Sequence, residues 1–161
     1  MAENNQFANH LESCPELILF DGFCHLCSRS VDFIIKRDKK GLFRFVALQS
    51  EAGEYLKRRL SLDVTADSVI LWKNGMLYYR SDAALRIALR LRFPWPLTGV
   101  FLIIPRIVRD RIYRLIADNR HRWFGKMDVC RFPSLEERHL FPSRDDLELQ
   151  ITRFVEPEHF G

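Results

Sequence analysis

An apolar run that leads through a turn into a C-x-x-C motif constrains the fold of this chain more than any other stretch. Leu17–Phe20 is apolar, and an Asp-Gly pair separates it from Cys24 and Cys27. A short apolar run closed by turn residues predicts a buried strand. Apolar residues then recur at helical spacing, so we expect a helix to begin at His25 and to end near Gly41.

The two cysteines of the motif are expected to play different roles. Cys27 shares a helical face with Val31 and Ile34 and should point into the core, whereas Cys24 should be exposed at the helix start. The unpaired N–H groups and the dipole of a helix N-terminus favour a thiolate, and they can lower a cysteine pKa from about 8.5 to about 3.5–7.5. We therefore expect Cys24 to attack a disulfide and Cys27 to resolve the mixed disulfide.

The following elements alternate between helix and strand patterns. We expect a strand at 43–48, a helix at 50–60, a hairpin at 68–79 and a helix at 81–92. Asn74-Gly75 is a strong hairpin signal because both residues tolerate a positive φ. Strands separated by helices should be parallel, and the hairpin should add an antiparallel edge. The sequence thus predicts an α/β fold, a thioredoxin-like β-α-β-α-β-β-α core with a C-terminal helical extension.

Four segments are predicted along the chain. A flexible N-terminal arm at 1–16 precedes the thioredoxin-like core at 17–93. A helical extension packed on the core follows at 94–133, and an acidic C-terminal tail that wraps the domain or stays mobile follows at 134–161. In the extension, apolar residues at helical spacing predict a buried stripe at Val108, Ile112, Leu115 and Ile116.

Composition narrows the class of protein. The chain has 161 residues, enough for one domain with a core of its own, and its net charge of +4 is too mild for a dedicated nucleic-acid binder. The first residues lack an apolar signal segment, and no apolar run is long enough to span a bilayer. We therefore expect a cytoplasmic protein with no nucleic-acid and no membrane partner. In that reducing compartment, a C-x-x-C is typical of redox-active or metal-binding sites.

Two blocks of the sequence resemble a known family. Asp21, Cys24 and Cys27 match the Asp-x-x-Cys-x-x-Cys signature of the DCC family of predicted thiol-disulfide oxidoreductases, and the Asn-Arg-His-Arg-Trp-Phe-Gly block at 119–125 is also similar to that family. The likeness extends over residues 17–140. It implies a thioredoxin-like fold, mainly in bacteria, and a disulfide-containing protein or a small thiol as substrate. We expect no cofactor.

One departure concerns substrate docking. Thioredoxins and glutaredoxins place a cis-proline just before the strand that follows their second helix, beside the reactive cysteine. Here no proline lies between Pro15 and Pro94. The candidates for that position are therefore Thr65, Asp67 and Ser68. Without the proline, we expect either that the substrate docks differently or that the exchange activity is weaker.

Other residues near the motifs have both a functional and a structural interpretation. His25 either stabilises the Cys24 thiolate or is an exposed residue at the helix start. Asp21 either accepts the Cys27 proton or only forms the turn. Arg120 and Arg122 either bind an anionic substrate or form a solvated helix face. Trp123 and Phe124 are expected to anchor the extension on the core.

Two other functions remain open on the sequence. Cys24 and Cys27 could be half of a zinc site completed by Cys130, Cys14 or His121, although a closed site needs four ligands and no second C-x-x-C exists. Alternatively, the chain could be a non-catalytic thioredoxin-like domain that docks a partner through its basic extension.

Overall fold

In the part of the chain that the structure describes, four strands form one mixed sheet in the order β2-β1-β3-β4. The structure is a computed structural model that describes residues 16–62, 69–131 and 133–155. The strands are β1 (Glu16–Phe20), β2 (Phe43–Ala47), β3 (Ile70–Lys73) and β4 (Met76–Tyr79). The helices are α2 (His25–Arg37), α3 (Glu51–Arg59), α4 (Arg80–Arg90), η1 (Trp95–Ile103), α5 (Arg106–Phe124), η2 (Arg138–Leu140) and α6 (Arg144–Val155).

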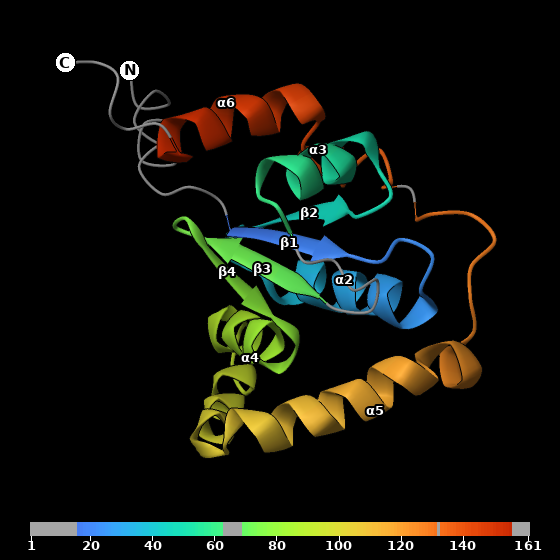
Figure 1. Ribbon diagram of the computed structural model, residues 1–161, viewed down its shortest axis with the longest axis vertical. Helices are drawn as coiled ribbons and strands as arrows, with labels where there is room; N and C mark the ends of the chain where they lie inside the picture. The colour runs from blue at the N-terminus through green and yellow to red at the C-terminus, as the bar shows by residue number, and fades with distance from the viewer. Residues whose placement is uncertain (1–15, 63–68, 132, 156–161) are drawn as a thin grey trace.

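Helices cover both faces of the sheet, as Figure 1 shows. Strand residues alternate between the two faces, so each face has its own apolar cluster. On one face, Ile18 and Phe45 pack with Val31 of α2 and Ile87 of α4. On the other face, the strands pack against α3 and α6, through residues that include Leu56, Leu147 and Ile151. The result is a three-layer α/β/α domain.

The order of elements from β1 to α4 confirms the predicted thioredoxin-like fold, but one strand direction differs from the prediction. β1 and β2 are parallel, as expected, whereas β3 pairs with β1 in an antiparallel manner. The segment 60–69 between α3 and β3 is long enough to reach either end of such short strands, so a strand-helix-strand pattern does not fix the direction. The hairpin between β3 and β4 is as predicted, with Asn74 at φ 48° and Gly75 at φ 77°.

The predicted helix starts are correct at two places and wrong at a third. Cys24 and Ser50 are the N-caps of α2 and α3, and the Ser50 hydroxyl accepts a hydrogen bond from Gly53 N at 3.1 Å. The expected cap Ser81 lies instead inside α4, where it is buried and donates a hydrogen bond to Asp110 of α5.

The C-terminal segment contributes to the core. Of the two alternatives predicted for the tail from 134, wrapping the domain or staying mobile, α6 agrees with the first, since it buries Leu147 and Ile151 against α3 and the sheet. These two residues are four positions apart and therefore lie on one helical face. The predicted N-terminal arm, 1–16, lies outside the described residues except for Glu16, which begins β1.

Helix α5 packs with the opposite face from the one predicted. Its buried residues are Asp110, Ala117 and Arg120. The expected buried stripe is exposed instead, at Val108, Ile112, Leu115 and Ile116, and so are the expected anchors Trp123 and Phe124. The reason is that α5 is held by polar contacts with α4, with the β1–α2 turn and with the backbone before β3.

No helix among the described residues has both the length and the apolar character needed to cross a bilayer.

Candidate active site

Cys24 and Cys27 lie together at the junction between β1 and α2, where the sequence places them. Cys24 has extended backbone angles at the N-cap, and its sulfur accepts a hydrogen bond from Cys27 N at 3.4 Å. The Cys27 thiol donates a second hydrogen bond to the Cys24 sulfur. The Cys24 sulfur thus receives two hydrogen bonds at the positive end of the α2 dipole, which favours its thiolate form.

The two cysteines differ strongly in pKa. The hydrogen bonds from Cys27, assisted by the charge of Arg120, lower the pKa of Cys24 to about 6 even though burial opposes the shift. The pKa of Cys27 is raised well above its usual range, because Cys27 donates a hydrogen bond to Cys24, is desolvated and faces the Cys24 charge. The pair therefore holds one proton on Cys27 and one negative charge on Cys24 near neutral pH.

The predicted exposure is wrong for Cys24, whereas Cys27 packs against the core cluster as expected. Cys24 is fully buried, whereas Cys27 is only half-buried. The chain after α5 covers Cys24, since Lys126 forms an antiparallel bridge with Cys24 and Met127 N donates to Phe23 O at 2.8 Å. Helical spacing places Cys27 on the inner face of α2, but it cannot show that a distant segment covers the N-cap.

Asp21 is the centre of a hydrogen-bond network beneath the motif. Its Oδ1 accepts hydrogen bonds from Phe23 N at 3.0 Å and from Gln49 Nε2 at 2.8 Å. Its Oδ2 pairs with Arg120 Nη2 at 3.0 Å. Gln49 Oε1 in turn accepts from Gly22 N at 2.9 Å. Asp21 thus forms the turn, as one of the two predicted interpretations holds, and also contacts Gln49, which follows β2, and Arg120 of α5.

Arg120 connects this network to the dithiol. Its side chain is 4% exposed, and its Nη1 lies 3.9 Å from the Cys27 sulfur while Nη2 contacts Asp21. The predicted solvated helix face is therefore wrong for Arg120, and its charge is balanced by Asp21 rather than presented to solvent. Arg122, which lies two residues further along α5, is exposed.

The remaining predicted residues are distributed around the motif. His25 is exposed at the first position of α2. Cys130 packs against the motif turn, because a Cβ at Gly22 would lie 2.2 Å from the Cys130 sulfur. Only glycine fits at position 22 without displacing that sulfur. Burial raises the pKa of the Cys130 thiol, and the nearby charge of Asp21 acts in the same direction.

Several predictions fall on residues that are not described. Thr65, Asp67 and Ser68, the candidates for the cis-proline position, lie outside the described residues, and so does Cys14. Among the residues that are described, no group of three or more His, Cys, Asp and Glu side chains is arranged to hold a metal ion. This finding gives no support to a zinc site that uses Cys130.

An apolar cavity borders the half-buried Cys27. It has a volume of about 570 Å³ and lies between α2, α4, η1 and α5. Its walls are almost wholly apolar and include Phe33, Ile87 and Trp95, while Cys27 and Arg120 contribute sulfur and charge. The cavity therefore gives one sulfur of the pair an apolar surrounding.

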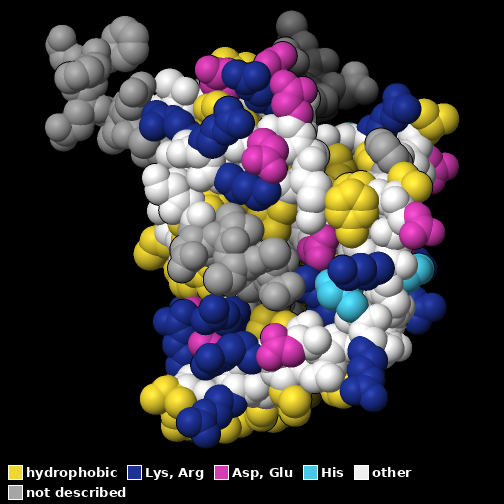
Figure 2. All heavy atoms as spheres, turned by 45° about the vertical axis from the view of Figure 1, so that its right-hand side comes forward, with side chains coloured by type: hydrophobic (Ala, Val, Ile, Leu, Met, Phe, Trp, Pro, Cys, Tyr) yellow, Lys and Arg dark blue, Asp and Glu magenta, His cyan; other side chains and the backbone are white. Residues whose placement is uncertain are grey.

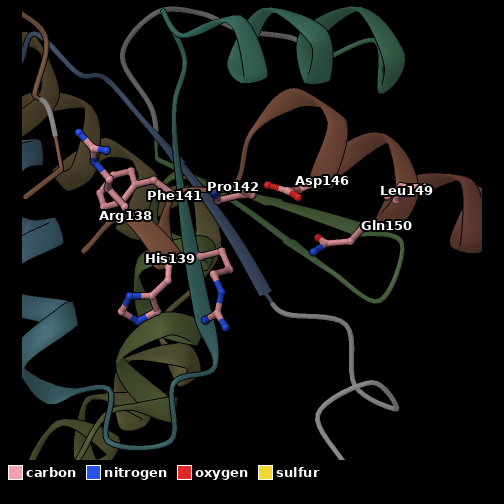
Figure 3. A pocket seen from close by; sticks show the side chains of 8 residues that line it. Arg138, His139, Phe141, Pro142, Asp146, Leu149 and Gln150 are labelled. Carbon is pink, nitrogen blue, oxygen red and sulfur yellow. The ribbon is translucent and has the colours of Figure 1, made fainter. Parts of the chain in front are cut away.

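A second cavity, of about 410 Å³, lies away from the dithiol. Figure 3 shows its side chains, which come from η2, the following turn and α6 and include Arg138, Asp146 and Gln150. Arg44 of β2 also lines it, and no cysteine does. It is therefore separate from the candidate active site.

Sequence reasoning missed two residues of the site. Gln49 follows β2 and contacts both Asp21 and Gly22, and Met127 covers the motif and accepts a hydrogen bond from Ser28 at 3.4 Å. A signal existed for Gln49, since β2 is parallel to β1 and ends at the same edge of the sheet. No local pattern marks Met127.

The fold and the site together define a class: a thioredoxin-like domain with a C-x-x-C pair at the N-terminus of α2, the helix that follows β1. Comparison with known proteins places the chain more narrowly. Residues 18–126 match the model of the DCC1-like thiol-disulfide oxidoreductase family, and the chain belongs to that family.

Two curated relatives agree with this assignment. The uncharacterized protein YuxK of Bacillus subtilis is 44% identical over 119 residues, which cover 73% of this chain and 87% of YuxK. The chloroplastic DCC family protein At1g52590 of Arabidopsis thaliana is 40% identical over 118 residues, which cover 71% of this chain and 67% of that protein. No solved structure matches the chain.

Proposed function

We propose that this protein catalyses thiol–disulfide exchange, with Cys24 as the attacking residue and Cys27 as the resolving residue. The Cys24 thiolate attacks one sulfur of a substrate disulfide, forms a mixed disulfide and releases the other substrate sulfur as a thiolate. Cys27 then loses its proton and attacks the Cys24 sulfur, which releases the second substrate thiolate. The substrate gains two electrons, and the protein is left with a Cys24–Cys27 disulfide.

The observation that carries this proposal is the position of Cys24 at the N-cap of α2. Its sulfur receives hydrogen bonds from the backbone and the thiol of Cys27, and its pKa is lowered to about 6. A thiol with a pKa near the ambient pH combines a high thiolate fraction with good nucleophilicity. The raised pKa of Cys27 keeps the second sulfur protonated until the mixed disulfide has formed.

The buried position of Cys24 adds a step before the attack. We propose that the segment 125–127 moves away from the motif to admit the substrate. This segment is held to the motif by the Cys24–Lys126 bridge and by the hydrogen bond from Met127 N to Phe23 O. Gly125, with φ 80°, begins the segment and provides backbone conformations that other residues rarely adopt.

Further roles are proposed for the neighbouring residues. Arg120 contacts both Asp21 and Cys27, and the charge of Asp21 helps to raise the pKa of Cys27. We therefore assign Asp21 to accepting the Cys27 proton during resolution and Arg120 to positioning both groups. His25 is proposed to stabilise the Cys24 thiolate when protonated. Thr65, Asp67, Ser68 and Arg122 stay candidates for substrate binding. A disulfide-containing protein or a small thiol remains the proposed substrate, and a reducing cytoplasm remains the proposed location.

Disulfide exchange by the purified full chain tests the proposal. The reduced protein should reduce a small aromatic disulfide, and Cys24→Ser should lose this activity. Cys27→Ser should form a mixed disulfide at Cys24 that persists and is detectable by mass spectrometry. Cys130→Ser, a matched change in a neighbouring cysteine, should keep most of the activity. Full exchange by Cys24→Ser would show that this sulfur is not the attacking group.

A further inference from the structure

The segment η1 is a run of nine uncharged, mostly apolar residues in which no residue is buried. Ile103 is 82% exposed, Leu97 is 63% exposed and Val100 is 59% exposed. An apolar segment of a stable domain normally gains its stability by leaving water. Here the described residues leave the outer side of η1 uncovered.

Helix α5 extends this uncovered apolar surface. Ile107 is 71% exposed, Leu115 is 59% exposed and Ile112 is 55% exposed, while the buried side of the helix carries Asp110 and Arg120. We call the whole surface the η1–α5 face and define it by Leu97, Val100, Phe101, Ile103, Ile107, Val108, Ile112, Leu115 and Ile116. Monomeric soluble proteins rarely expose contiguous apolar patches of more than a few hundred Å², and a larger patch marks an interaction surface.

Positive charge is interspersed with the η1–α5 face, since Arg111 lies four positions from both Ile107 and Leu115 on α5. Arg106, Arg111, Arg114 and Arg122 are exposed on α5, whereas Asp118 is the only exposed acidic residue between 92 and 124. Figure 2 shows hydrophobic side chains along the lower edge of the molecule, with Lys and Arg side chains beside them. The lower edge of Figure 1 is formed by η1 and α5.

This charge distribution selects the kind of partner. In a symmetric dimer through this face, the exposed arginines of one copy would face the same arginine-bearing surface of the second copy, and like charges across an interface are unfavourable. An anionic bilayer offers the complementary arrangement, because apolar side chains enter the boundary between headgroups and acyl chains while arginines contact lipid phosphates. We propose that the η1–α5 face docks on the surface of a bilayer that contains anionic lipids.

The proposal does not depend on the chemistry of the cysteines, and it replaces the expectation that the protein has no membrane partner. It concerns docking on a surface, since α5 keeps its polar side on the domain through the Ser81–Asp110 and Asp21–Arg120 contacts. The cavity beside Cys27 also includes Phe101 and Ile116 of this face in its walls. Apolar space therefore continues from the docking face toward the dithiol.

Vesicle flotation with the full chain tests the proposal. We expect the protein to float with vesicles of phosphatidylcholine and phosphatidylglycerol, to float far less with phosphatidylcholine alone, and to be released by added salt. Ile103→Asp combined with Ile107→Asp should weaken binding to the anionic vesicles by at least about tenfold. Arg111→Gln combined with Arg114→Gln should weaken it by about tenfold and reduce its salt dependence.

A matched variant separates this face from exposed apolar surface in general. Leu149 on α6 is 71% exposed, as is Ile107, and it lies outside the η1–α5 face. Leu149→Asp should bind vesicles like the unchanged protein, and circular dichroism should show that all variants are folded. Equal binding by the Ile103→Asp/Ile107→Asp variant would overturn the proposal. A stable dimer that Ile107→Asp dissociates, without vesicle binding, would assign the face to a second copy and also overturn it.

Discussion

Arg120 is a buried cation that pairs with the Asp21 carboxylate at 3.0 Å, although the two residues are 99 positions apart in the sequence. Both side chains are at least about nine-tenths buried, so neither charge is compensated by water. A buried ion pair adds little stability over an apolar pair, but the loss of one member leaves the other charge without compensation. At the scale of single residues, each of the two buried charges is therefore tolerated in the fold only while the other is present.

Asp21→Asn and Arg120→Gln should each lower the free energy of unfolding by about 3–5 kcal/mol, because each leaves a buried charge unpaired. Urea denaturation measures this effect. Arg111→Gln, a substitution at an exposed position of the same helix, should change the free energy of unfolding little. If Asp21 also accepts the Cys27 proton, Asp21→Asn should slow decay of the mixed disulfide more than its formation. Equal free energies of unfolding for all three variants would show that the ion pair does not stabilise the fold.

Cys24 should titrate well below an ordinary thiol. Its alkylation rate should rise with pH to a half-maximum near pH 6, because only the thiolate reacts. Cys27→Ala removes the thiol that donates to Cys24 and should move the midpoint toward 9. Mass spectrometry of iodoacetamide-treated protein, with the rate normalised to its plateau, measures the midpoint. A wild-type midpoint near 9 would contradict the assignment.

The same shift links the charge of Cys24 to folding. Since the pKa of Cys24 is lowered from 9.0 to about 6 in the fold, the thiolate stabilises the reduced protein. This contribution is complete above pH 9 and is lost as the pH falls through about 6. Reduced protein should therefore lose more stability than Cys24→Ser between pH 9 and pH 6.

At the scale of elements, α5 and α6 show how far apolar periodicity can be trusted. In α6, Leu147 and Ile151 recur four residues apart and are buried. In α5, a similar spacing at Val108, Ile112 and Leu115 marks the exposed side. Periodicity identifies an apolar face, but it does not say whether the domain itself or something outside it covers that face.

The contribution of α6 to the core is testable. Ile151→Ala should lower the free energy of unfolding by about 2–4 kcal/mol, since Ile151 is fully buried against α3 and the sheet. Leu149→Ala, a change of similar size on the exposed side of the same helix, should have little effect. Thermal or urea unfolding measures both. Similar values for the two variants would show that α6 is a peripheral tail.

At the scale of the whole molecule, the sequence could predict what local patterns determine. The strand-turn-helix unit, the Asn74-Gly75 hairpin and the thioredoxin-like order are correct, because each depends on neighbouring residues. The burial of Cys24 and the partner of Asp21 depend on chain about a hundred residues away, so no local pattern reports them. The face that α5 presents to the core is set by polar contacts, which hydrophobic periodicity does not detect.

The contact between Asp21 and Arg120 also shows that the candidate site extends beyond the thioredoxin-like core into α5. A fragment cut after α4 would keep every strand and both motif cysteines, and it would match a minimal thioredoxin in outline. It would nevertheless lose the guanidinium that pairs with Asp21, the Tyr113 hydroxyl that accepts a hydrogen bond from Val69 N, and the segment that covers Cys24. The candidate active site is thus assembled from two segments about a hundred residues apart, and the extension is as much a part of it as the C-x-x-C itself.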